Sequence, residues 1–128
     1  MEKARKAEKD PKAFVPLTPA MFQILVALAD GERHGYAIMR EVDAQTGSTI
    51  RLGPATLYTS LRRLLTSGLV EENGDRPDPR LDDERRRYYR LSGLGRRVAI
   101  AETDRLEALV KAARRKPAFN EVIAHKCM

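Results

Sequence analysis

The stretch from Gly53 to Gly68 constrains the chain most, because its ends and its spacing both define one helix. Pro54 suits the first turn of a helix, where its missing N–H would find no partner, and Gly68 suits the left-handed residue that stops one. The leucines between them recur at i, i+4, i+7 and i+8, so they form one apolar face that must pack against a core. These residues are Leu57, Leu61, Leu64 and Leu65.

The opposite face of this helix carries small side chains, hydroxyls and two guanidinium groups, and it carries no acid. A helix that packs on one side and is free of negative charge on the other can lie in the major groove of DNA. Taken alone, the pattern fits a solvated amphipathic helix equally well, so the flanking sequence has to decide. The residues of this face are Ala55, Thr56, Thr59, Arg62, Arg63 and Thr66.

The composition favours an acidic partner. Lysine and arginine number 24 against 18 acids, which gives a net charge of +6, and nucleic acid is the commonest acidic partner of such chains. The 128 residues suit one domain with a modest core. Cys127 is the single cysteine, so no intrachain disulfide can form. We expect a cytoplasmic protein without a membrane partner, because no apolar stretch approaches bilayer length and the charged N-terminus lacks a signal region.

Two helices are expected before the Gly53 stretch. Thr18 and Pro19 have the chemistry of an N-cap and a first helical position, and they predict a helix from Pro19 to Ala29. A second helix opens at His34-Gly35-Tyr36 and closes at Gly47. We expect His34 to be a turn or cap residue rather than a metal ligand, because His125 is the only other histidine.

After Gly68 the periodicity changes from helical to extended. Residues 69–72 and 85–91 are predicted strands, and residues 73–83 form a loop rich in glycine, proline and charge. Three helices followed by such a hairpin make a mainly α fold with a small β-hairpin, the winged helix-turn-helix plan. The Gly53 helix is then the reader and the hairpin is the wing. The wing strand carries Arg85, Arg86, Arg87 and Arg90. It fits a solvated, charged sheet edge too, but its place after the reader helix favours DNA contact.

A last helix is predicted from Ser92 to about Arg115, with Pro117 at its end. Its apolar residues drift around the helix, and little core is left to cover them, so pairing with a second copy of the chain is the economical solution. The predicted divisions are a flexible basic arm (1–16), a winged domain (17–91), a dimerisation helix (92–116) and a tail (117–128). Phe14 and Val15 are exceptions in the arm that dock on the body or on a partner chain. The expected dimer contacts are Leu94, Val98, Ala101, Leu106, Leu109 and Val110.

The chain resembles the PadR family of bacterial transcription regulators over roughly residues 17 to 110. A Pro-x-Thr-Leu-Tyr segment at 54–58 and a Tyr-Tyr-x-Leu-Ser segment at 88–92 are specific at this separation, and each alone is weak. The other matching segments are 17–18, 24–25, 34–38, 52–53, 61–64, 68–70, 87 and 95–96. The resemblance implies a homodimeric DNA-binding regulator, usually a repressor, with the last helix as dimer element and one C-terminal helix as in the shorter members. By the same resemblance the residues that face DNA include Tyr36, Thr56, Tyr58 and Arg63.

Two departures from the family pattern matter. The wing loop carries Asp75, Asp78, Asp82 and Asp83, so we assign phosphate contact to the strand arginines Arg85, Arg87 and Arg90 rather than to the loop tip. Some short members bind flat aromatic drugs through a tryptophan, and this chain has none, so that binding mode is not carried over. A small-molecule inducer is left open.

Other classes of function fit the sequence less well. The sequence lacks a Ser/His/Asp or Cys/His pattern, a glycine-rich phosphate loop and a metal-ligand cluster, so we expect no enzyme, no cofactor and no metal. The alternatives that remain open are a winged-helix protein-interaction module and an architectural DNA binder without sequence preference.

Overall fold

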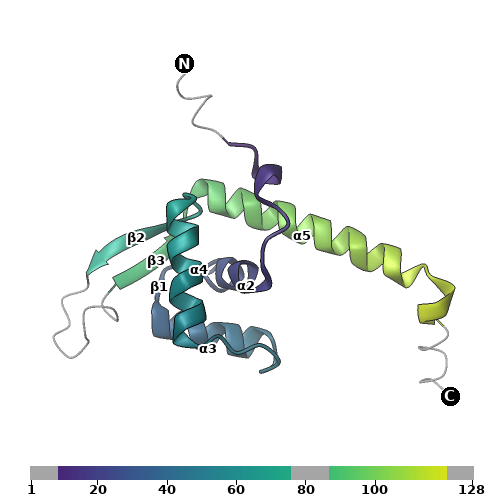
Figure 1. Ribbon diagram of the computed structural model, residues 1–128, viewed down its shortest axis with the longest axis horizontal. Helices are drawn as coiled ribbons and strands as arrows, with labels where there is room; N and C mark the ends of the chain where they lie inside the picture. The colour runs from purple at the N-terminus through teal and green to yellow at the C-terminus, as the bar shows by residue number, and fades with distance from the viewer. Residues whose placement is uncertain (1–8, 76–86, 121–128) are drawn as a thin grey trace.

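Helices with a small antiparallel sheet at one side of them make up the part of the chain that this computed structural model describes, residues 9–75 and 87–120 (Figure 1). The predictions that concern Arg85, Arg86, most of the wing loop and Cys127 lie outside these residues. The elements are η1 (Pro11–Phe14), α2 (Pro19–Ala27), β1 (Arg33–His34), α3 (Gly35–Gln45), α4 (Pro54–Thr66), β2 (Val70–Asp75), β3 (Arg87–Leu91) and α5 (Gly93–Arg114).

Side-chain caps fix three of the helix starts where the sequence predicts them. The Thr18 hydroxyl accepts the N–H of Met21 at 3.1 Å. His34 Nδ1 accepts the N–H of Ala37 at 3.1 Å, so this histidine caps α3 as expected. The Ser92 hydroxyl opens α5 in the same way. Helix α2 ends at Ala27, two residues before the predicted end, because its last N–H groups tighten into i→i+3 bonds that lead into a turn.

The apolar face of α4 is confirmed as the centre of the core. Leu57, Leu61 and Leu64 are at most 1% exposed, and Leu65 is partly buried against them. Gly68 has a φ of +80°, the left-handed conformation that ends the segment after α4. The leucines of α4 share the core with Ile24, Leu25, Ile38, Val42, Leu69, Val70, Tyr89 and Val98.

The sheet has three strands in the order β1-β3-β2, whereas the sequence predicts a two-stranded hairpin. The added strand β1 is Arg33–His34, which pairs antiparallel with Tyr88 and Tyr89. Two residues are too short to show an alternating pattern, so sequence reasoning could not detect β1. Strand β2 also runs to Asp75 rather than ending at Glu72, because it stays paired with β3 across a bulge.

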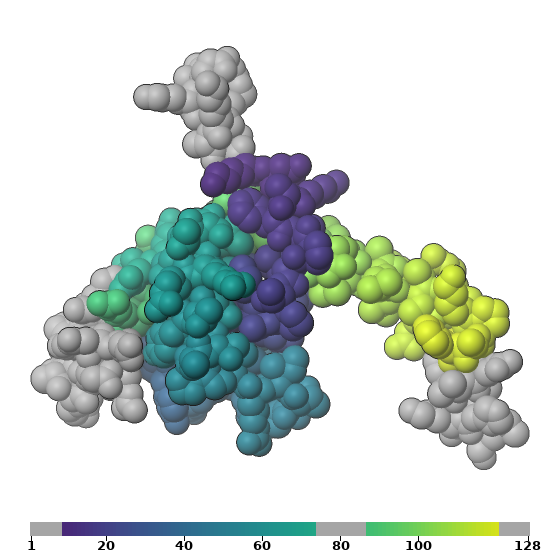
Figure 2. Space-filling model, in the orientation of Figure 1, coloured from purple at the N-terminus to yellow at the C-terminus, as the bar shows by residue number. Residues whose placement is uncertain are grey.

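The N-terminal segment is attached to α5 from residue 11 onward. The short helix η1 lies over α5 (Figure 2), and Phe14 and Val15 pack against the core, as expected for these two exceptions. Part of the segment that the sequence assigns to a flexible basic arm thus contacts α5 and the core in the structure. Beyond the body, the C-terminal half of α5 projects away from the other helices (Figure 1). No helix within residues 9–75 and 87–120 is long and apolar enough to cross a membrane.

Candidate nucleic-acid interface

The outer face of α4 presents small groups, hydroxyls and guanidinium groups to solvent. Ala55, Thr56 and Thr59 are exposed near its N-terminal end, and Arg62 and Arg63 are exposed further along. Neither arginine forms an ion pair with another described residue, and α4 contains no acid. The core holds the opposite face, so α4 offers a fixed, positively charged surface.

The two tyrosines assigned to DNA lie in different environments. Tyr36 is 49% exposed in the first turn of α3, and the guanidinium carbon of Arg40 is 5.8 Å from its ring centroid. Tyr58 is only partly exposed, because its ring lies against Gly35, where an added Cβ would overlap its hydroxyl. Tyr58 therefore helps to hold α4 on the start of α3, a packing role that the sequence did not suggest.

The two described wing arginines leave β3 on opposite faces, as the period of a strand requires. Each is paired with an acid of β2. Arg87 Nε lies 3.2 Å from Glu72 Oε2, and Arg90 Nε lies 3.0 Å from Glu71 Oε1. Sequence reasoning missed both pairs, because strand register decides which side chains meet.

A hollow of about 150 Å³ lies between α4 and the face of the sheet that carries Arg87. We call it the helix–wing hollow. Arg62 of α4 and Arg87 of β3 both line it, so the structure brings a cation of α4 together with a cation of β3. The hollow is lined by Tyr58, Leu61, Arg62, Leu65, Glu72, Arg87 and Tyr89.

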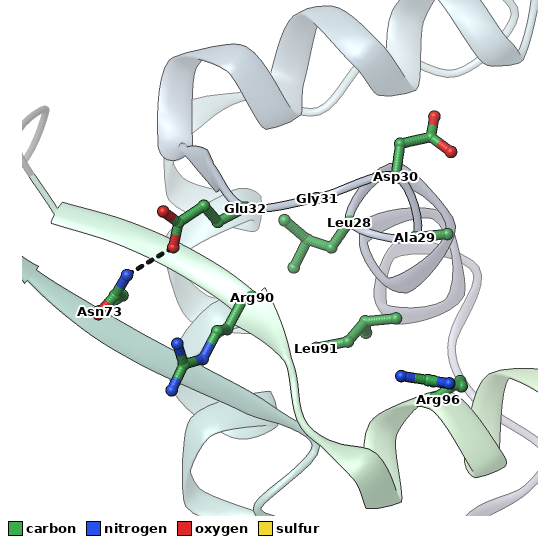
Figure 3. Close-up of a pocket in the computed structure, with 9 residues that line it drawn as sticks. All are labelled: Leu28, Ala29, Asp30, Gly31, Glu32, Asn73, Arg90, Leu91 and Arg96. Carbon is green, nitrogen blue, oxygen red and sulfur yellow. Dashed lines mark hydrogen bonds between the residues drawn. The ribbon is translucent and has the colours of Figure 1, made fainter.

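Arg90 faces a different surface (Figure 3). It lines a wider pocket of about 720 Å³ between the sheet, the turn after α2 and the start of α5. Acids border this pocket at Asp30 and Glu32, and the side chain of Asn73 donates to Glu32 at 2.6 Å. The structure therefore does not bring Arg90 together with the exposed face of α4.

The candidate dimer residues on α5 divide into two groups. Val98 is fully buried in the core and Leu94 packs against it, so both are occupied within one chain. Leu109 and Val110 are 58% and 51% exposed on the projecting half of α5. Ile100 is 53% exposed and was not singled out from the sequence. Ala101 and Leu106 are partly exposed.

A buried acid links α5 to the segment before α2. Glu102 is 2% exposed, and its carboxylate accepts the N–H of Leu17 at 3.1 Å and two N–H groups of Arg105 at 2.7 and 2.9 Å. The hydrogen bonds from Arg105 lower the pKa of Glu102 against the opposing effect of burial. Among the described residues there is no cluster of three or more side chains that could hold a metal ion.

Three helices, a small sheet ending in a wing and a long last helix define a winged-helix protein. The sequence matches the transcriptional regulator PadR-like family over residues 24–101. The chain therefore belongs to the PadR-like family of transcriptional regulators.

Solved structures share the fold at low sequence identity. A transcriptional regulator from Clostridium thermocellum has a TM-score of 0.64 at 21% identity, over 83% of this chain and 92% of that one. A PadR family transcription regulator from Clostridium difficile R20291 has a TM-score of 0.63 at 19% identity, over 77% of this chain and 97% of that one. RosR of H. salinarum has a TM-score of 0.56 at 26% identity, over 89% and 93%.

Two curated relatives are similar in sequence. One is an uncharacterized 37.1 kDa protein in transposon TN4556 of Streptomyces fradiae, 36% identical over 90 residues, or 70% of this chain. The other is uncharacterized protein X of Lysinibacillus sphaericus, 32% identical over 74 residues, or 57% of this chain. The chain spans 24% and 64% of the lengths of these relatives.

Proposed function

We propose that this transcriptional regulator is a homodimeric, sequence-specific DNA-binding repressor that places the exposed face of α4 in a major groove. One observation carries the proposal: α4 is fixed by a buried leucine face, and its opposite face holds hydroxyls and two arginines without an acid. Such a helix approaches the phosphate backbone without repulsion and presents donors to base edges.

The contacts divide according to their place in the fold. Thr56 and Thr59 lie near the start of α4, where recognition helices usually meet base edges. Arg62 and Arg63 lie further along, within reach of backbone or guanine. Arg87 of β3 is assigned to phosphate. Arg85 keeps the phosphate assignment that the sequence suggests. Arg90 is left out of this assignment, because it lines the pocket on the other side of the sheet. Tyr36 is assigned to the backbone beside the start of α3, with Tyr58 and Ala55 at the edge of the same surface.

Dimerisation through α5 is the second part of the proposal. The projecting half of α5 exposes Leu109 and Val110, and a second copy would cover them. The proposed divisions are then a winged domain over residues 17–91 and a dimerisation helix over 92–116.

Release by a small-molecule inducer is the third part. A hollow of about 540 Å³ lies between η1 and α5, within the size range of ligand sites, and Val15, Ile100 and Ala101 line it.

The experiment begins with selection of a binding duplex from a random DNA pool. The selected duplex and its single-base variants are then titrated with wild type, Arg87→Ala, Thr56→Ala and Thr59→Ala at two salt concentrations. Arg87→Ala should weaken binding to every duplex alike. It should also reduce the slope of log binding constant against log salt concentration, called the salt slope below, by about one unit. The threonine variants should change preference at one base pair by about 1–3 kcal/mol.

The outcome separates the proposed function from its alternatives. If Arg87→Ala alters base preference while the threonine variants only scale affinity, the reader and the wing are assigned the wrong way round. Equal binding to all duplexes would support an architectural binder. Absence of binding to any duplex, random or selected, would support a protein-interaction module and refute the proposal.

A further inference from the structure

We propose that the helix–wing hollow is the seat of one DNA backbone phosphate, held by Arg62 and Arg87 together, and that Glu72 competes with this phosphate for Arg87. The inference rests on the proposed DNA binding and goes beyond it by naming a shared site and an internal competitor. Its effect is on affinity for all duplexes rather than on the choice of sequence, because phosphates carry no sequence information.

The lining of the hollow suits a small anion. Among the described residues, its charged lining groups are Arg62 from α4, Arg87 from β3 and one acid, Glu72 from β2. Leucine and tyrosine side chains form the rest of the wall, at Leu61, Leu65 and Tyr89. Such a wall excludes part of the water around a bound phosphate, which strengthens its attraction to the two guanidinium groups.

The position of the hollow also suits a backbone phosphate. It lies between the reader helix and the wing, so a DNA strand that leaves the groove occupied by α4 would pass it before meeting the wing. Both guanidinium groups come from rigid elements, since α4 is fixed by its buried leucines and β3 is the central strand of the sheet.

Glu72 engages the cation that a phosphate would need. Its Oε2 lies 3.2 Å from Arg87 Nε, and its side chain is 35% exposed, so the pair is accessible from solvent. Carboxylate and phosphate oxygens bind guanidinium in the same way, and a guanidinium has a limited set of donors. A phosphate that enters the hollow must therefore displace Glu72 or share Arg87 with it.

The chain provides a matched control for this competition. Glu71 is the neighbouring acid of β2, and it pairs with Arg90 at 3.0 Å in the same chemistry. Arg90 faces the other side of the sheet, toward the pocket of Figure 3. Glu71→Gln thus removes the same charge from the same strand, but away from the helix–wing hollow.

The test compares Glu72→Gln with Glu71→Gln on the duplex selected above, with folding checked by circular dichroism. Glu72→Gln should bind roughly two- to fivefold more tightly, the range that corresponds to one exposed ion pair. Its plot of log binding constant against log salt concentration should be steeper by a fraction of one unit, because Arg87 no longer divides its charge between phosphate and Glu72. Glu71→Gln should leave both quantities nearly unchanged. Glu72→Ala repeats the test if the glutamine variant is poorly folded.

A second measurement asks whether the two arginines share one phosphate. Arg62→Gln and Arg87→Gln are compared with the double variant at several salt concentrations. If one phosphate is shared, the double variant should lose about one unit of salt slope rather than two. A loss near two units would assign the arginines to separate phosphates and would refute the shared phosphate site.

The failure of this inference is distinguishable from that of the proposed function. If wild type binds the duplex but Glu72→Gln is no tighter, or Glu71→Gln gains equally, the competition is overturned while DNA binding stands. If wild type binds no duplex, both are overturned.

Discussion

Replacement of the buried acid Glu102 by alanine should destabilise the fold by about 2–4 kcal/mol. The carboxylate is 2% exposed and accepts one backbone N–H from Leu17 and two side-chain N–H groups from Arg105. Hydrogen bonds to a charged group contribute about 1.5–3 kcal/mol each, and an orphaned buried N–H costs about 1–3 kcal/mol. Water can solvate the Arg105 guanidinium when Glu102 is removed, because the Arg105 side chain is 38% exposed. The expected loss of stability is therefore smaller than the sum of the three hydrogen bonds.

The pH dependence of this loss follows from the lowered pKa of Glu102. Its ordinary value is 4.5, and the hydrogen bonds from Arg105 hold the folded value below it. A group with a lowered folded pKa stabilises the fold above its unfolded pKa, and this contribution is lost as the pH falls through the folded pKa. The difference between wild type and Glu102→Ala should therefore be complete at neutral pH and shrink in acid below the ordinary value.

The assay is urea unfolding followed by circular dichroism at one fixed protein concentration, since association would shift the apparent stability. Glu107→Ala is the matched control, because its pair with Lys111 on the same helix is 4.0 Å long and exposed. The control should change the free energy of unfolding by at most about 0.5 kcal/mol. Equal stability of Glu102→Ala and the control at neutral pH would refute the assigned role of Glu102.

Two further experiments test the start and the far end of α5. Gly95→Ala should destabilise the fold by roughly 1–3 kcal/mol in thermal or urea unfolding, because the new Cβ would overlap the backbone carbonyl of Leu69. Gly93→Ala meets nothing closer than 3.7 Å and should be close to neutral, and an equal loss at both sites would contradict this argument. Acidic replacement of Leu106 and Leu109 together should dissociate the proposed dimer in light scattering, and a double variant that stays dimeric would place the interface elsewhere.

Local signals in the sequence were sufficient to predict where the helices start and which face of α4 is buried. Thr18 and Ser92 cap helices because a hydroxyl can reach an N–H within three residues, and this geometry needs no distant partner. The leucine face of α4 was equally readable, because one period fixes which side is buried. These local features are enough to predict the bounds and the buried face of α4 without any tertiary contact.

Features that depend on contacts between residues far apart in the sequence could not be predicted from local patterns. Strand β1 exists because Arg33 and His34 meet Tyr89 and Tyr88, more than fifty residues later. The pairing of Arg87 with Glu72 depends on register across the wing. Glu102 could have been suspected, since it lies four residues after the core residue Val98 on the inward stripe of α5. A charge at such a position indicates a buried partner.

Helix α5 begins one residue after the wing strand, with Ser92 between them, and its first turns belong to the core through Val98. It is therefore a lever whose short end is built into the wing domain. Its 22 residues span about 33 Å at 1.5 Å per residue. If its far half pairs with a second copy, the crossing angle of the two α5 helices sets the distance between the two winged domains. By the same lever arm, a tilt of about 10° at that crossing would displace a wing domain by about 6 Å, which exceeds the 3.4 Å spacing of base pairs along one strand. A molecule that alters this crossing angle would shift one winged domain along the DNA that it contacts, without itself touching DNA.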